Sequence, residues 1–222
     1  MLVSKRMTRD PVSASPDLPL AEALRVLRGH RVRHLPVVAG GEVVGIVTDR
    51  DLRLALPSPL SAGGADAEAV ERTPVSRLMT RGVVTIGPYD SVEDAAKLMH
   101  RHRIGGLPVV DAHGALLGML SETDVLDAFA EMLGPPGASS RLELALPDRP
   151  GELARAMGII GAELGLNICS LMVPPGRHGE RRIAIVHLAT IDPREMIAAL
   201  EAAGYQVGWP SLEMDLRRGA PA

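Results

Sequence analysis

Apolar residues follow the same pattern twice in the first 133 positions. Each half begins with a short extended stretch, expected at Pro11–Ser13 and at Val83–Ile86. Apolar residues at helical spacing come next, and two short apolar strands joined by a Gly-containing turn follow them. A second helix is expected to begin near Asp49 in the first half and near Glu122 in the second. Each half therefore predicts a β-α-β-β-α unit.

Aliphatic side chains and two methionines carry most of these patterns. The helical spacing is that of Leu20, Ala23, Leu24 and Leu27, and that of Val92, Ala95, Ala96 and Met99. The predicted strands are Leu35–Val38, Val43–Val47, Leu107–Val110 and Leu116–Leu120. Asp90 or Ser91 is placed to cap the helix of the second half, because both side chains accept hydrogen bonds from a helix start.

An internal repeat underlies the two patterns. Met7-Thr8-Arg9 recurs as Met79-Thr80-Arg81, an offset of 72 residues. The offset is 73 between Gly45-Ile46-Val47-Thr48 and Gly118-Met119-Leu120-Ser121. The extra residue lies in the turn between the two strands, where an insertion costs little. Self-similarity at a fixed period indicates two copies of one structural unit.

The strand-to-helix junction of each copy carries the most specific motif. Gly45-Ile46-Val47-Thr48-Asp49-Arg50-Asp51 and Gly118-Met119-Leu120-Ser121-Glu122-Thr123-Asp124 share a glycine, two apolar residues, a hydroxyl residue and an aspartate three positions later. This pattern resembles that of the CBS domain, and two copies in tandem resemble a Bateman module. The resemblance covers about residues 1–131. It implies an α+β fold that binds adenosyl ligands between its two repeats.

A hydroxyl and a carboxylate three residues apart at such a junction also have a physical meaning. Both side chains point into the same space, where a helix start offers N–H groups to an anion such as a phosphate. An ionised carboxylate only accepts hydrogen bonds, so it suits the hydroxyl donors of a ribose. The alternative is that these residues only cap their helices, Thr48 or Asp49 in the first copy and Ser121 or Glu122 in the second. Capping explains the hydroxyl residue but does not require the aspartate.

The CBS resemblance implies two clefts that each take residues from both repeats. One cleft would bring together Thr48, Asp51, His34, Thr85, Ile104 and Gly105. The other would bring together Ser121, Asp124, Gly106, Ser13, Val32 and Arg33. The expected ligand is an adenine nucleotide (AMP, ADP or ATP) or S-adenosylmethionine, and no obligatory cofactor is expected. His34 stands where some relatives carry a phosphate-binding arginine, and Gly106 offers no side chain there, so the cleft around Asp51 is expected to suit a phosphorylated ligand better.

A different pattern fills the last third of the chain. After a linker rich in Pro and Gly at 134–140, residues 141–146 alternate as in a half-buried strand. Helical spacing then runs from Leu153 to Leu164. Strands are expected at Ile168–Val173 and Arg182–Thr190, a capped helix from Asp192 to Gly204, and a last strand at Tyr205–Val207. The order β-α-β-β-α-β is that of a ferredoxin-like fold.

The turn after the first of these strands reads Asp148-Arg149-Pro150-Gly151-x-Leu153, and Asn167-Ile168 opens the second strand. This arrangement resembles the ACT domain, over about residues 139–209. The resemblance implies that an amino acid binds between two ACT domains, in a homodimer, through Asp148, Arg149, Pro150, Gly151, Asn167 and Ile168. The alternative is that Asp148 and Pro150 only start a helix and that Asn167 only forms a turn.

Composition narrows the choice of partners. Lys and Arg number 24 against 27 Asp and Glu, a net charge of −3 that argues against broad binding to nucleic acid. Aromatic residues make up 2%, so stacking platforms for single strands are scarce. The only cysteine, Cys169, fits a reducing cytosol. The sequence shows no signal peptide and no apolar run near the ~18 residues of a membrane span, so a cytoplasmic protein without a membrane partner is expected.

The sequence shows no arrangement typical of a catalytic or metal site. His100 and His102 are close, but no cysteine partner or His-Glu-x-x-His motif accompanies them. Cys169 and His187 lie in strand patterns, which favours a buried thiol over a nucleophile. The expected function is that of a non-catalytic regulatory ligand sensor that acts through its own dimer or on a partner enzyme. The alternatives are an interaction module with empty clefts and a nucleotide-processing enzyme.

The predicted domain order is CBS repeat 1 (1–56), a linker (57–74), CBS repeat 2 (75–133), a linker (134–140), an ACT domain (141–209) and a tail (210–222). This order resembles that of the bacterial acetoin-utilisation regulatory proteins of the B type.

Overall fold

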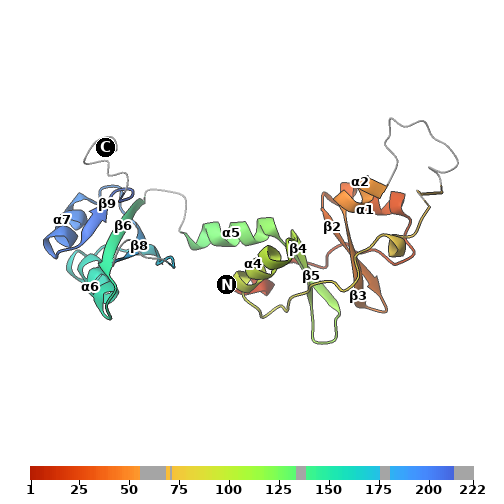
Figure 1. Cartoon of the computed structure of the whole chain (residues 1–222), viewed down its shortest axis with the longest axis horizontal. Coiled ribbons are helices and arrows are strands. Elements are labelled where there is room, and N and C mark those ends of the chain that lie inside the picture. Colours follow the sequence, from red (N-terminus) through yellow and green to blue (C-terminus); the bar gives the residue numbers. More distant parts are fainter. Residues whose placement is uncertain (56–68, 71, 134–138, 176–180, 213–222) are drawn as a thin grey trace. The chain divides into compact units, whose positions relative to one another are not determined.

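The computed structural model describes residues 1–55, 69–70, 72–133, 139–175 and 181–212 (Figure 1). They belong to two compact units, Met1–Ala128 and Phe129–Ala222. Most of the predicted linkers at 57–74 and 134–140 and of the predicted tail at 210–222 lies outside the described residues.

The first unit contains the predicted helices and strand pairs of both repeats, except for residues 129–132 of the last helix. In the first repeat these are α1 (Leu20–His30), β2 (His34–Ala39), β3 (Glu42–Thr48) and α2 (Asp49–Ala55). In the second they are α4 (Val92–His102), β4 (Gly106–Val110), β5 (Leu116–Ser121) and α5 (Glu122–Met132). The predicted helix starts at Asp49 and Glu122 are confirmed. Ser91, one of the two proposed caps, accepts a hydrogen bond from the backbone N–H of Asp94 at 3.0 Å.

The prediction of a strand at the start of each repeat is wrong in its position. Pro11–Ser13 and Val83–Ile86 form no regular strand, and only single bridges link Ala14 to Val37 and Ile86 to Val109. A short strand lies earlier instead, at β1 (Thr8–Arg9), after a 3-10 turn η1 (Val3–Lys5). The second repeat has the equivalent turn η2 (Val75–Arg77). The apolar residues of the extended stretches are half-buried, apart from the buried Ile86, and have no partner strand along their length.

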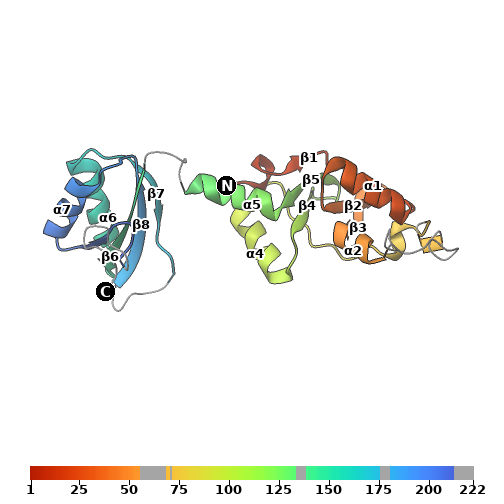
Figure 2. The same cartoon turned by 90° about the horizontal axis from the view of Figure 1, so that it is seen from above.

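The beginning of each repeat packs on the other repeat. β1 pairs antiparallel with β5 of the second repeat, where Thr8 lies opposite Met119, and the two strands lie side by side in Figure 2. Thr80 exchanges two backbone hydrogen bonds with Ile46 of β3, at 2.9 and 3.0 Å. Backbone hydrogen bonds between the repeats begin further upstream. The N–H of Val3 donates to the carbonyl of Asp90, and the N–H of Val75 donates to the carbonyl of Leu18. Each repeat therefore completes the structure of its partner repeat.

Two glycines make this reciprocal packing possible. A Cβ atom on Gly118 would lie 2.9 Å from the carbonyl oxygen of Thr8 and closer still to the sulfur of Met7. A Cβ atom on Gly45 would meet the side chain of Met79 at less than 3.0 Å. The crossing segment can thus approach each strand only where the strand has no side chain.

Buried aliphatic side chains fill the first repeat, and its core takes in residues from the second. The cluster consists of Ala14, Leu20, Ala23, Leu27, Leu35, Val37, Val47, Leu52, Val75 and Met79. Val75 and Met79 belong to the segment that crosses over from the second repeat. Hydrophobic burial and backbone pairing therefore hold the two repeats together at the same place.

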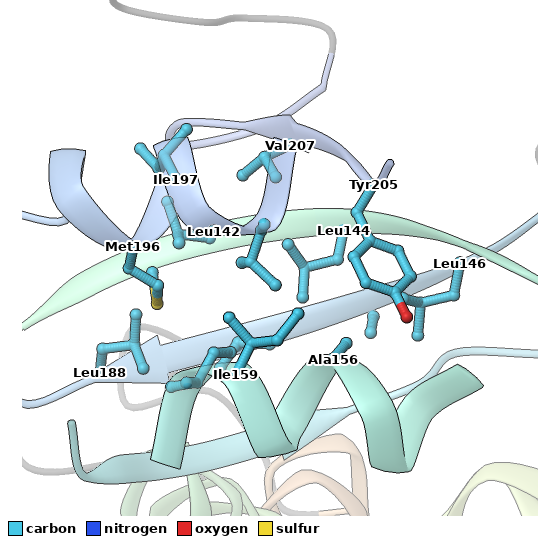
Figure 3. Packing of buried hydrophobic residues seen from close by; sticks show 14 residues of the cluster. Leu142, Leu144, Leu146, Ala156, Ile159, Leu188, Met196, Ile197, Tyr205 and Val207 are labelled. Carbon is cyan, nitrogen blue, oxygen red and sulfur yellow. The ribbon is translucent and has the colours of Figure 1, made fainter. Parts of the chain in front are cut away.

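The second unit has the predicted β-α-β-β-α-β order. Its elements are β6 (Ser140–Pro147), α6 (Glu152–Gly158) with a π-helical turn η3 (Ile159–Glu163), β7 (Ile168–Met172), β8 (Arg181–Leu188), α7 (Arg194–Ala202) and β9 (Gln206–Gly208). The sheet order is β7-β8-β6-β9. Side chains of β6 and β8 pack against both helices in one core, which Figure 3 shows from close by.

The predicted caps of this unit are wrong. Asp148 does not cap α6, because the helix begins only at Glu152, after Gly151 with a φ of +90°. The capped helix expected from Asp192 begins at Arg194 instead, after Pro193, and Pro193 provides no side-chain capping bond. The carboxylate of Asp192 accepts a hydrogen bond from the N–H of Arg194 at 3.1 Å and pairs with that residue's guanidinium.

Replacing Gly118 with alanine is expected to lower the free energy of unfolding by about 1–3 kcal/mol, because the backbone of Thr8 cannot rotate away as a side chain can. Gly45→Ala should cost less, since only the Met79 side chain has to move. Gly29→Ala in α1 is the matched control, because nothing lies within 4 Å there and alanine favours a helix. Equal free energies of unfolding for Gly118→Ala and Gly29→Ala in urea would contradict the close approach of Thr8 to β5.

Candidate functional site

The junction between β3 and α2 holds the first hydroxyl–carboxylate pair. Thr48 donates from its hydroxyl to Oδ2 of Asp51 at 2.7 Å and from its N–H to the same oxygen at 3.0 Å. The N–H of Asp51 donates back to the Thr48 hydroxyl at 3.2 Å. These reciprocal bonds form a capping box that starts α2.

The junction between β5 and α5 repeats the arrangement. Ser121 donates from its hydroxyl and its N–H to Oδ2 of Asp124, at 2.6 and 2.7 Å, and the N–H of Asp124 donates back at 3.3 Å. The capping contacts are therefore present at both junctions. They occupy one carboxylate oxygen of each aspartate, and within the described part of the chain neither Oδ1 atom has a hydrogen-bond partner. Capping fixes the carboxylate and leaves that oxygen for a further donor.

The first pair opens on a cavity of about 580 Å³, the Asp51 cavity. Its lining contains His34, Thr48, Asp51, Ile104 and Gly105, as the sequence predicted for one cleft. Thr85 is not in the lining, and Val83 and Val84 are there instead. Gly106, expected in the other cleft, also lines this cavity.

The second pair opens on a cavity of about 480 Å³, the Asp124 cavity. It brings together Ser121, Asp124, Val32 and Arg33, which were predicted for the second cleft. Ser13 is exposed and outside the lining, which contains Pro11 and Val12. The reason is the bridge from Ala14 to Val37, because an extended chain that turns Ala14 inward turns Ser13 outward.

Sequence reasoning missed several charged residues of the linings. Arg50, Arg103 and Glu122 line the Asp51 cavity, and Asp10 lines the Asp124 cavity. Arg31 and Arg103 are equivalent in the repeat, and both end a helix with a φ of +55°. That equivalence was the signal that could have identified Arg103.

Arg33 and His34 line both cavities. The expected preference of the Asp51 cleft for a phosphorylated ligand rested on His34, so the shared position removes this reason for it. Burial lowers the pKa of His34 below its usual value, and the charge of Arg33 lowers it further. Glu122 and Asp51 act in the opposite direction. The imidazole is therefore largely neutral near pH 7.

Each cavity combines apolar walls with polar groups. The Asp51 cavity has Ile46, Val83, Val84 and Ile104 on its walls, and Arg33, Arg50 and Arg103 supply positive charge. Both volumes lie within the range of small-molecule sites, about 300–1,000 Å³. The geometry suits a ligand with a flat apolar part, hydroxyl donors and an anionic group.

The residues predicted to bind an amino acid lie at opposite ends of the second unit's sheet. Asp148 follows Pro147 at one end of β6, whereas Ile168 pairs with Leu188, which lies opposite Ser140 at the other end. Seven residues separate the ends of β6, so the two groups are about 24 Å apart along the strand. One copy of this unit does not close a pocket from both groups.

Other candidate chemistry is distributed as follows. Cys169 is half-buried, and the side chain that meets Nδ1 of His187, at 2.8 Å, is the hydroxyl of Ser170. Among the described residues, no group of three or more His, Cys, Asp and Glu side chains is arranged to hold a metal ion. Within the same residues, no helix has the length and apolar character needed to cross a membrane.

Comparison with known proteins identifies the family of the residues that form the two cavities. The model of the CBS domain matches residues 3–58 and 75–131, about half of the chain. The chain belongs to the CBS-domain family. Its predicted tandem CBS pair is thereby confirmed, and the matched residues end before the second unit's sheet.

Relatives of the CBS pair include proteins of different kinds. A CBS domain-containing protein of Dictyostelium discoideum is 40% identical, over 61% of this chain and 95% of its own length. A Vibrio cholerae structure described as an acetoin utilization protein is 27% identical, with a TM-score of 0.51, over 60% of this chain and 93% of its own. CBSX2 of Arabidopsis thaliana, solved in complex with AMP, is 29% identical, with a TM-score of 0.50, over 59% of this chain and 96% of its own.

The half-buried imidazole of His34 predicts a pH dependence of the stability of the ligand-free CBS pair. Because folding lowers the pKa of His34, the unfolded chain binds more protons once the pH falls below about 6.5, and stability contributed by the neutral ring is then lost. His34→Gln should therefore lose less stability than the wild type between pH 7.5 and 5.5 in urea unfolding. His113→Gln, at an exposed turn outside both cavities, is the control. Identical pH profiles for His34→Gln and the wild type would contradict this role.

Proposed function

We propose that the chain is a non-catalytic regulatory sensor whose CBS pair binds an adenine nucleotide, AMP, ADP or ATP. The observation that carries the proposal is the repeated geometry: two cavities, each with a hydroxyl–aspartate pair at a strand-to-helix junction. The complex of CBSX2 with AMP supports an adenosyl ligand in this family. S-adenosylmethionine is a second ligand of the same class.

The chemistry of the two cavities suggests a role for each group. The second carboxylate oxygen of Asp51 or Asp124 accepts a hydrogen bond from a ribose hydroxyl. The apolar walls, Ile46 and Ile104 among them, receive the adenine ring. Arg33 and His34 meet the phosphate, with Arg33 as the permanent charge because the imidazole is largely neutral.

An interaction module with empty clefts is the second candidate function. The capping boxes favour it, since Thr48, Asp51, Ser121 and Asp124 already have hydrogen-bond partners that start two helices. The two candidates differ in what a ligand does to stability, because only a bound ligand stabilises the folded chain. A nucleotide-processing enzyme would need a base and a metal or nucleophile together in one cavity.

For the second unit, we propose an ACT domain that works in a homodimer. The opposite placement of Asp148–Gly151 and Asn167–Ile168 supports this, because a pocket that uses both groups needs a second copy. An amino acid would bind at that interface and the CBS pair would regulate the dimer or a partner enzyme in the cytoplasm. The proposed boundaries remain 1–56 and 75–133 for the CBS repeats and 141–209 for the ACT domain, in an order like that of the acetoin-utilisation regulators.

Thermal unfolding of the full chain tests the nucleotide site. One site saturated at 100 times its dissociation constant stabilises the folded state by about 2.7 kcal/mol, so AMP, ADP or ATP should raise the melting temperature. Asp51→Ala and Asp124→Ala should each remove part of the rise, and a double variant should remove all of it. The absence of any shift with these nucleotides and S-adenosylmethionine at millimolar concentration would support the empty-cleft function.

Sedimentation velocity tests the ACT proposal. The full chain is expected to form a dimer whose population grows with concentration. Amino acids should shift this equilibrium, because a ligand that binds between two copies stabilises their association. A monomer at every concentration, with and without amino acids, would rule the proposed pocket out.

A further inference from the structure

The starts of β2 and β4 are equivalent positions of the two repeats but carry different side chains. Arg33 and His34 of the first repeat correspond, at the offset of 72, to Gly105 and Gly106 of the second. The surrounding backbone is equivalent, because the N–H of Asp49 donates to the Arg33 carbonyl and that of Glu122 donates to the Gly105 carbonyl. Where the starts of β2 and β4 meet, only the first repeat therefore contributes side chains.

The imidazole of His34 occupies the space that the two glycines leave. A Cβ atom on Gly106 would lie 3.0 Å from Nδ1 of the ring and 3.0 Å from the terminal methyl of Met119. A Cβ atom on Gly105 would lie 3.4 Å from Nε2 and 3.3 Å from a carboxylate oxygen of Glu122. Met119 lines the Asp124 cavity and Glu122 lines the Asp51 cavity. The ring thus stands at the boundary between the two cavities.

The remaining arginines and His30 are not shared. Arg31 and His30 line only the Asp124 cavity, and Arg50 and Arg103 line only the Asp51 cavity. Each cavity also contains carboxylates that offset its own cations. Arg33 and His34 are therefore the positive or protonatable groups that both cavities use.

We propose that the two nucleotide sites compete for this shared pair, so that AMP bound in one cavity weakens the binding of AMP in the other. The inference rests on the proposed nucleotide-binding function and adds the coupling between its two sites. The first phosphate engages Arg33 and draws His34 toward it. A second phosphate then finds these groups already paired and also meets the negative charge of the first. Adenosine has no phosphate, so its binding at the two sites is independent.

The coupling is measured by calorimetric titration of the full chain with AMP and with adenosine at pH 7.5. Asp124→Asn and Asp51→Asn each leave one working cavity and give its association constant alone. The coupling factor is the product of these two constants divided by the product of the two stepwise constants of the wild type. We expect a factor of about 5 or more for AMP, within the usual range of site-to-site coupling, and a factor near 1 for adenosine.

Two arginine variants distinguish the shared charge of Arg33 from the unshared charge of Arg50. The same set of titrations is carried out with each variant. Arg33→Gln should lower the AMP factor, leaving only the part that arises from repulsion between the two phosphates. Arg50→Gln, the matched control, should weaken AMP only in the Asp51 cavity and leave the factor unchanged. The proposal of a shared pair is overturned if the AMP coupling factor is near 1 in the otherwise unmodified chain, or if Arg33→Gln does not lower it. In either case the proposed nucleotide-binding function still stands. No binding of either AMP or adenosine overturns both.

Discussion

The reciprocal crossing of the two repeats is the constraint on which the CBS pair depends. The segment around Thr8 pairs with β5, and Thr80 pairs with β3, each at a strand whose glycine permits the approach. The sheet of the second repeat includes β1 from the first, and the core of the first repeat includes Val75 and Met79 from the second. The crossing also brings the two strand starts together, so that His34 packs on Gly105 and Gly106. Both cavities exist because the exchange holds the two junctions on either side of this contact.

Local patterns were sufficient to predict the helices and strands of each repeat. The spacing of Leu20, Ala23 and Leu27 is set by the face of a single helix, and all three are buried in α1. The crossing could not be predicted in the same way, because Thr8 pairs with Met119, more than a hundred residues away, and no local periodicity records such a partner. The strand expected at Pro11–Ser13 failed for the same reason, since its apolar residues reported burial and not pairing.

The parts of the candidate site that lie in the repeated motif could be predicted from the sequence. The other parts could be predicted less well. The pairs Thr48–Asp51 and Ser121–Asp124 follow from a motif within four residues, which one turn of backbone holds together. Thr85 and Ser13 were placed by resemblance, and the side of an extended chain that faces a cavity changes with each residue. The sharing of Arg33 and His34 depends on the packing of two distant strand starts against each other, so only the three-dimensional structure shows it. In the second unit, Gly151 replaces Asp148 at the helix start through its positive φ.

The central claim is that an adenine nucleotide binds between the CBS repeats through the junction aspartates. A crystal structure of the full chain grown with AMP tests it most directly. The account predicts a ribose hydroxyl within hydrogen-bond distance of the Asp51 or Asp124 carboxylate, the adenine against the apolar wall of the same cavity, and the phosphate toward Arg33. Well-ordered crystals with both cavities empty at saturating AMP, or with AMP bound away from both junctions, would contradict the account.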